Sequence, residues 1–96
     1  MLMLITYDVA TETPGGKRRL RQVGRACLDF GHRVQYSVFE CEVDSAQWTA
    51  LRARLIGLID EKTDSLRFYR LGTGGHDRIE HVGAKPVLDL EGPLVF

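Results

Sequence analysis

The first nine residues, MLMLITYDV, form an almost unbroken apolar run that ends with a tyrosine, an aspartate and a valine. This pattern predicts a strand over residues 2–9 that lies at the centre of a sheet and is covered on both faces. The run is too short to span a membrane, and it lacks the basic start of a signal peptide. We therefore expect a central strand with Asp8 near its end, a loop at 10–16, and a cytoplasmic protein.

The length of the chain limits it to one hydrophobic core. It has 96 residues, of which 44% are hydrophobic, and a chain of this size buries roughly two-thirds of its surface on folding. This composition argues against disorder. Cys27 and Cys41 fall among apolar positions and form no CxxC pattern. They are predicted to be buried, reduced thiols rather than metal ligands or a disulfide.

Two amphipathic helices are predicted. The first runs from about 17 to 30 and stops at Gly31. Its apolar stripe consists of Leu20, Val23, Ala26, Cys27 and Phe30. Asp44, with Gln47 three residues later, predicts a capping box before the second helix. The buried stripe of the second helix consists of Trp48, Leu51, Leu55, Leu58 and Ile59.

The segment RVQYSVFECEV, residues 33–43, alternates in hydrophobicity but shifts phase by one residue between Val38 and Phe39. Such a slip moves the apolar set to the opposite face, so the segment is either one bulged strand or two short strands. Phe39 is accordingly either turned outward by a bulge or packed in the core. Further strands are predicted at 65–71 and, on an edge, at 78–82.

The order of these elements predicts an α+β fold. We expect a ferredoxin-like βαββαβ sandwich, an antiparallel sheet with two helices on one face plus a short C-terminal edge strand. This domain should span 1–83. Residues 84–96 contain several aliphatic side chains and are predicted to form an interface tail toward a dimer partner or another protein.

The charge is neutral overall but unevenly distributed. Between residues 17 and 33 there are six basic residues and one acid, which indicates either a phosphate-facing surface or an ordinary solvated helix face. The candidates for nucleic-acid contacts are Lys17, Arg18, Arg19, Arg21 and Arg25. Binding through these residues would be strongly dependent on salt.

Asp8 is the main candidate for chemistry. It is either a turn or cap aspartate, or a ligand of Mg²⁺, which prefers carboxylate oxygens and keeps several waters. A single carboxylate supplies few protein ligands for a metal ion. Two copies of Asp8 that meet across a two-fold axis would make a better one, and small domains commonly form such dimers.

Four segments together resemble the CRISPR-associated protein two family: YDV at 7–9, KRRLRQV at 17–23, RVQYSVFECEV at 33–43 and DSLRFYRLG at 64–72. These small proteins partner the CRISPR integrase in spacer acquisition. The resemblance implies a ferredoxin-like homodimer that bridges two integrase dimers. It also implies an endonuclease, dependent on Mg²⁺ or Mn²⁺, that acts on single-stranded RNA or double-stranded DNA.

The resemblance also implies roles for individual residues. Asp8 corresponds to the aspartate that holds a divalent cation, one from each protomer, and Tyr7 is its matching neighbour. Arg33 and Phe39 match the residues linked to nuclease activity, and the early helix arginines align best with Arg19 and Arg21. In the family's mechanism the metal coordinates the scissile phosphate and activates a water.

Two other readings stay open. In the first, the chain is a non-catalytic dimeric scaffold of the integrase complex, and Asp8 is only structural. The second, less favoured, is an unrelated ferredoxin-like regulatory domain that binds a small molecule.

Overall fold

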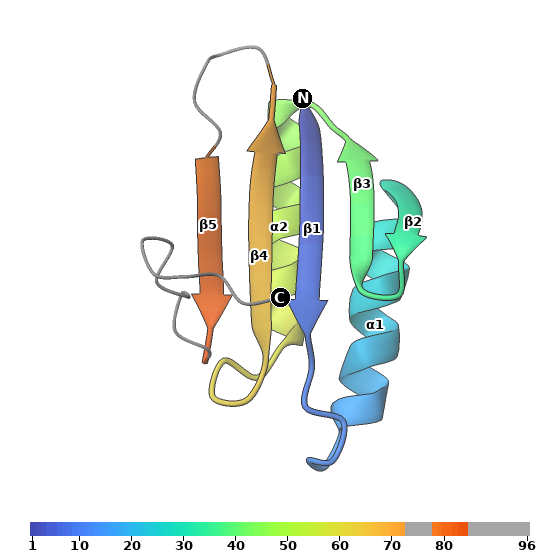
Figure 1. Cartoon of the computed structure of the whole chain (residues 1–96), viewed down its shortest axis with the longest axis vertical. Coiled ribbons are helices and arrows are strands. Elements are labelled where there is room, and N and C mark those ends of the chain that lie inside the picture. The colour runs from blue at the N-terminus through green and yellow to red at the C-terminus, as the bar shows by residue number, and fades with distance from the viewer. Residues whose placement is uncertain (73–77, 85–96) are drawn as a thin grey trace, which may run out of the picture.

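The computed structural model describes residues 1–72 and 78–84, which form a five-stranded antiparallel sheet with both helices on one face (Figure 1). The strand order is β2-β3-β1-β4-β5. The elements are β1 (Leu2–Asp8), α1 (Gly16–Leu28), β2 (Gly31–Gln35), β3 (Val38–Glu42), α2 (Ser45–Leu58), β4 (Ser65–Leu71) and β5 (Arg78–Gly83). The predicted ferredoxin-like α+β fold is confirmed, including the C-terminal edge strand. The predicted interface tail, apart from Ala84, lies outside the described residues.

Strand β1 occupies the centre of the sheet and pairs antiparallel with β3 and β4. Its side chains alternate: Met3, Ile5 and Tyr7 are buried, whereas Leu2 and Leu4 are only half-buried. The central position was predicted correctly, but coverage on both faces was not. Both helices lie on the same face of the sheet, so the helices leave the second set of β1 side chains uncovered.

The segment with the phase shift forms a hairpin of two short strands, which is one of the two predicted alternatives. Strands β2 and β3 are joined by a turn at Tyr36 and Ser37, and their register shifts between Arg33 and Gln35. The shift and the turn explain the change of phase. Phe39 has no solvent exposure. Its core-packing alternative is therefore confirmed, and the outward-turned alternative is wrong.

Helix α1 ends at Leu28, two residues earlier than predicted, and Asp29 is its C-cap. Gly31 is already the first residue of β2 rather than the helix stop. A Cβ atom at Gly31 would lie 2.0 Å from the carbonyl oxygen of Glu40. Glycine is therefore required here because two backbones approach closely, and not because a helix needs a left-handed end.

Helix α2 begins with the predicted capping box. The Gln47 backbone N–H donates to Asp44 Oδ1 over 2.7 Å, and the Asp44 N–H donates to Gln47 Oε1 over 2.9 Å. Two donors at the helix start are thereby satisfied. Leu51 and Leu55 are buried as predicted, and Trp48 packs edge-on against Phe68 with ring centroids 4.9 Å apart.

Both cysteines are buried free thiols, as predicted. Burial raises the pKa of Cys27 to about 12 and that of Cys41 to about 11. The Cys41 Sγ donates to the Cys27 carbonyl across 3.7 Å, which ties β3 to α1. Among the described residues, no helix has both the length and the apolar character that a membrane span requires.

Candidate functional site

Asp8 is the last residue of β1, and it is exposed. It lies opposite Ser65 in the register with β4, and it follows Tyr7, which faces the helices. Side chains alternate along a strand, so Asp8 belongs to the sheet face that carries no helix. On this face the next row of the sheet pairs Thr6 with Arg67, as the strand alternation and register require.

The backbone next to Asp8 is held by Asp64, a residue that the sequence analysis did not single out. The Ala10 N–H donates to Asp64 Oδ1 over 3.0 Å, and the Asp60 N–H donates to Asp64 Oδ2 over 2.9 Å. Asp64 has no exposed surface, and it directly precedes Ser65, the pairing partner of Asp8. Strand β1 is therefore fixed on both sides of its last residue.

Arg19 completes this network from α1. Its Nε donates to Asp64 Oδ2 over 2.8 Å, and its Nη atoms donate to the Pro14 carbonyl over 3.0 Å and to Thr13 Oγ1 over 2.8 Å. The guanidinium thus finds its partners within the fold, and its side chain is only 16% exposed. This position does not suit the predicted nucleic-acid contact, because binding would require breaking an internal ion pair.

The pKa of Asp64 reflects this environment. Burial acts to raise the pKa of the carboxyl group, but hydrogen bonds from Arg19, from the Asp60 and Ala10 amides and from the Thr63 hydroxyl outweigh burial. The pKa consequently lies below its ordinary value. The carboxylate stays ionised at neutral pH and anchors three chain segments at the end of the sheet that carries Asp8.

Three further predicted site residues come together on the helix side of the sheet. The Arg33 guanidinium lies 5.0 Å from the centroid of the Phe39 ring, which stacks with Tyr7 at a centroid distance of 6.1 Å. The Tyr7 hydroxyl donates to the Tyr36 carbonyl over 3.4 Å. Burial raises the pKa of Tyr7, and the nearby Arg33 acts in the opposite direction. This cluster lies on the face of the sheet opposite to Asp8, and it supports β1, the strand that carries Asp8.

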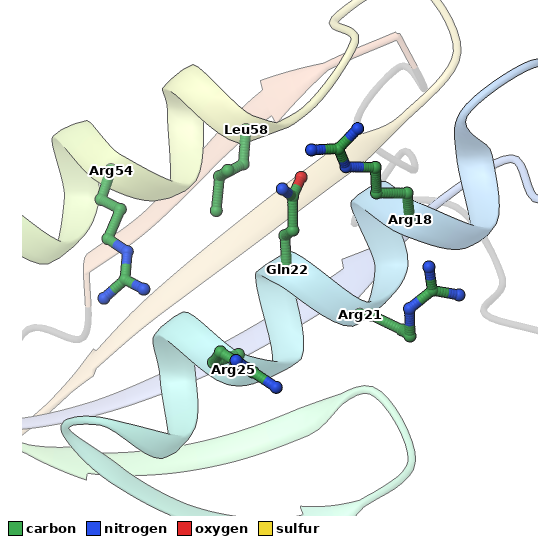
Figure 2. A pocket seen from close by; sticks show the side chains of 6 residues that line it. All are labelled: Arg18, Arg21, Gln22, Arg25, Arg54 and Leu58. Atoms are coloured by element: carbon green, nitrogen blue, oxygen red, sulfur yellow. The ribbon is translucent and has the colours of Figure 1, made fainter.

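The remaining arginines of α1 border a groove between the two helices (Figure 2). Its volume is about 390 Å³. It is lined by Arg18, Arg21, Gln22, Arg25, Arg54 and Leu58. Lys17 is exposed on α1 but is not part of the lining. The sequence analysis missed Arg54, because only the packing of α2 on α1 brings it to these residues.

The residues present suit a hard cation only in part. Within 1–72 and 78–84 no group of three His, Cys, Asp or Glu side chains could hold a metal ion. Asp8 offers carboxylate oxygens, the ligand type that Mg²⁺ prefers, and Mg²⁺ often uses only one or two carboxylates. A single chain therefore supplies half of the ligand pair that the sequence analysis expected.

Comparison with known proteins agrees with this fold. The family model for CRISPR associated protein Cas2 matches residues 1–79. The chain is 59% identical over 96 residues to CRISPR-associated endoribonuclease Cas2 of Nitratidesulfovibrio vulgaris, covering 100% of this chain and 94% of the relative. It is also 59% identical to CRISPR-associated endonuclease Cas2 of Halalkalibacterium halodurans, covering 100% of both.

A solved structure shows the same similarity. The crystal structure of Streptococcus pyogenes Cas2 at pH 6.5 superposes with a TM-score of 0.70 and 57% sequence identity, covering 77% of this chain and 89% of that one. The match in sequence thus extends to the arrangement of the strands and helices that position Asp8. On these grounds the chain belongs to the Cas2 family of CRISPR-associated proteins.

Proposed function

We propose that this protein is a metal-dependent endonuclease of CRISPR spacer acquisition that acts as a homodimer around Asp8. The observation that carries the proposal is the exposed Asp8 carboxylate at the end of the central strand, on the face without helices. The Nitratidesulfovibrio and Halalkalibacterium relatives are named as an endoribonuclease and an endonuclease, which supports nucleic-acid cleavage.

The uncovered sheet face supports a homodimer. Strand alternation and register gather half-buried or exposed apolar side chains there. They are Leu2, Leu4, Val38, Tyr69, Leu71 and Ile79. The most exposed of these residues is Ile79, at 45%. A second copy packed on this face would cover these side chains, and a two-fold axis near the end of β1 would bring the two Asp8 carboxylates together.

In such a dimer each part of the site has a distinct task. The two Asp8 carboxylates would hold a Mg²⁺ or Mn²⁺ ion, which when bound neutralises phosphate charge and lowers the pKa of its water. The Tyr7–Phe39–Arg33 cluster would keep the strand that bears Asp8 in place. Arginines of α1 would bind the phosphates of RNA or DNA, and the dimer would bridge two integrase dimers.

One observation favours a second candidate function. In the described parts of the chain, Asp8 does not belong to any group of three His, Cys, Asp or Glu side chains that could hold a metal ion. A dimer whose pair of carboxylates was the whole metal site would have few groups for general acid–base catalysis. The alternative is therefore a non-catalytic dimeric scaffold of the integrase complex.

A cleavage assay separates the two functions. Purified protein is incubated with single-stranded RNA or duplex DNA in Mg²⁺, Mn²⁺ or EDTA, and the wild type is compared with Asp8→Asn. The matched control is Glu61→Gln, which neutralises an exposed acid in the turn before β4. Cutting that requires metal and is lost only in Asp8→Asn supports the nuclease. No cutting under any condition, or equal cutting by Asp8→Asn, leaves the scaffold.

A further inference from the structure

A pocket beside the start of α2 lies on the helix side of β4 and β5. Strand β5 is at the edge of the sheet, to one side of α2 (Figure 1). The pocket has a volume of about 330 Å³, and its lining includes Trp48 of α2 and Phe68 and Arg70 of β4. Phe68 is buried against Trp48, and Arg70 shares its face of the strand because side chains alternate. The pocket is therefore on the opposite side of the sheet from Asp8.

The floor of this pocket is apolar. Met3 and Phe68 are almost completely buried, at 3% and 1% exposure, and Met1 and Trp48 are half-buried. Aromatic residues, methionine and arginine are the residue types enriched where proteins contact one another. Methionine also adapts its shape to different neighbours. The floor therefore suits an apolar side chain of another protein.

Two arginines on the rim of the pocket repel each other. Arg70 and Arg78 lie directly opposite in the antiparallel register of β4 and β5. Opposed Cβ atoms in such a register are about 5 Å apart, and like charges there are destabilising. Both residues are exposed, and within 1–72 and 78–84 neither guanidinium forms a hydrogen bond or an ion pair. An anion placed between them would relieve the repulsion.

The acid in the pocket lining is already engaged. Glu80 is the one acidic residue that the described parts of the chain contribute to this lining. Arg52 of α2 donates to it twice, from Nε to Oε1 over 2.8 Å and from Nη2 to Oε2. This hydrogen bonding lowers the pKa of Glu80, so the carboxylate stays ionised at neutral pH and paired with Arg52. The positive charge of the rim is therefore left for a ligand.

We infer that this pocket binds a segment of a partner protein that carries a carboxylate next to a large apolar side chain. The carboxylate lies between Arg70 and Arg78, and the apolar side chain lies on Trp48 and Phe68. A small phosphate anion would use only the rim, and a nucleic-acid backbone would leave the apolar floor without a contact. Opposite charges across an interface favour one class of partner over others. The combination of rim and floor thus selects an acidic peptide segment.

This inference goes beyond the proposed function and does not depend on it. Neither Asp8 nor any arginine of α1 lines the pocket. The dimer proposed above uses the uncovered face of the sheet, which shares only the edge residue Ile79 with the pocket. Such a dimer would present two copies of the pocket on its outer, helix-bearing sides.

Trp48 provides a direct readout of binding, because it is the only tryptophan in the chain. Its emission is titrated in EDTA with blocked hexapeptides in which two glutamates flank a leucine, a phenylalanine or a methionine. Matched peptides carry glutamine in place of both glutamates. The protein variants are Arg70→Gln and Arg78→Gln. The control is Lys62→Gln, which removes an exposed positive charge in the turn before β4.

We expect at least one acidic peptide to change the emission saturably, and its glutamine counterpart to bind several-fold more weakly. Arg70→Gln and Arg78→Gln should each weaken binding several-fold, whereas Lys62→Gln should bind like the wild type. Both arginine variants should melt at or above the wild-type temperature, since each removes one of two opposed like charges. A loss of binding in these variants then reflects the site and not the folding.

Three outcomes would overturn the inference. They are no saturable change in emission with any acidic peptide, equal affinity for the glutamine peptides, and wild-type affinity in both arginine variants. Pyrophosphate or a short single-stranded oligonucleotide that changes the emission at lower concentrations than the peptides would make the pocket a phosphate site and would overturn it too.

The same titration keeps the two proposals apart. Peptide binding by a protein that cleaves no nucleic acid would defeat only the nuclease. Cleavage by a protein that binds none of the peptides would defeat only the pocket.

Discussion

The Arg33 guanidinium lies over the ring of Phe39, with its central carbon 5.0 Å from the ring centroid. The pair lies beneath α1, since a Cβ on Gly24 would come within 3.1 Å of Arg33 Nη2 and 3.3 Å of the Tyr7 hydroxyl. Asp8 belongs to the other face of the sheet. Residues linked to activity through the family resemblance therefore lie on the two opposite faces of the sheet, and their substitutions should act in different ways.

Phe39→Ala should act through folding. The side chain is fully buried, and removal of a buried phenylalanine costs about 3–5 kcal/mol in the free energy of unfolding. Urea unfolding followed by circular dichroism measures this loss. Arg33→Gln, which removes an exposed cation–π contact with the same ring, should cost about 1 kcal/mol or less. A Phe39→Ala protein as stable as the wild type would show that the ring is not a core residue.

Asp64→Ala should destabilise the protein by about 3–5 kcal/mol, because it leaves Arg19 and two backbone amides without their buried acceptor. Glu61→Gln serves as the control, since an exposed acid in the same turn should change the free energy of unfolding by less than about 0.5 kcal/mol. Equal stability of the two variants in urea would mean that the network does not hold the fold.

Acid should remove part of the stability that these carboxylates supply. Hydrogen bonds hold the pKa of Asp64 below its usual value against the effect of burial, and the hydrogen bond from Arg52 lowers the pKa of Glu80. The unfolded chain then binds protons more readily than the folded one. The contribution is fully present above pH values of about 4–5 and is lost as the pH falls through the lowered folded values.

Urea unfolding at neutral pH and at a series of acidic pH values tests this dependence. The free energy of unfolding should fall with pH in the wild type and fall less steeply in Asp64→Ala, which lacks one of the two groups. The same slope in both proteins would rule out a contribution from Asp64.

The capping box of α2 should contribute about 1 kcal/mol. Asp44→Ala removes the acceptor of the Gln47 amide, and loss of an N-cap side chain costs about that amount. Ser45→Ala, one residue further on, is the matched control, since within the part of the chain that the structure describes the Ser45 hydroxyl forms no hydrogen bond. If thermal melting shows similar midpoints for the two variants, the capping box has no measurable effect.

The thiols should be inert in the folded protein. Burial raises the pKa of Cys27 to about 12 and that of Cys41 to about 11, so the reactive thiolate is scarce at neutral pH. A disulfide reagent that absorbs on reaction should modify both cysteines rapidly in urea and very slowly without it. Fast modification in the absence of urea would show that one thiol becomes accessible in the native state.

Much of the fold could be predicted because its patterns are local. Alternation along 33–43, the helical stripes and the Asp44–Gln47 spacing each depend on neighbours in sequence. The role of Gly31 could not be predicted, since the requirement comes from the Glu40 carbonyl on an adjacent strand. A glycine after a helix looks the same in sequence whether it ends the helix or admits a second backbone.

The candidate site was predictable to a similar degree. Asp8 is visible as a carboxylate at the end of an apolar run, and the family resemblance adds Tyr7 and Arg33. The inward position of Arg19, unlike that of its neighbours, could not be predicted, because its partner Asp64 lies 45 residues away. Nothing in the run of basic residues distinguishes the one arginine that turns inward from those that line the groove.

The hydrogen bonds around Asp64 affect more than stability. They fix the chain two residues beyond Asp8, while pairing with Ser65 fixes it from the other side. A carboxylate on a fraying strand end would have to be ordered each time a ligand arrived, at a cost in conformational entropy. Here the backbone is preorganised during folding, so this cost does not reduce the affinity of whatever Asp8 binds.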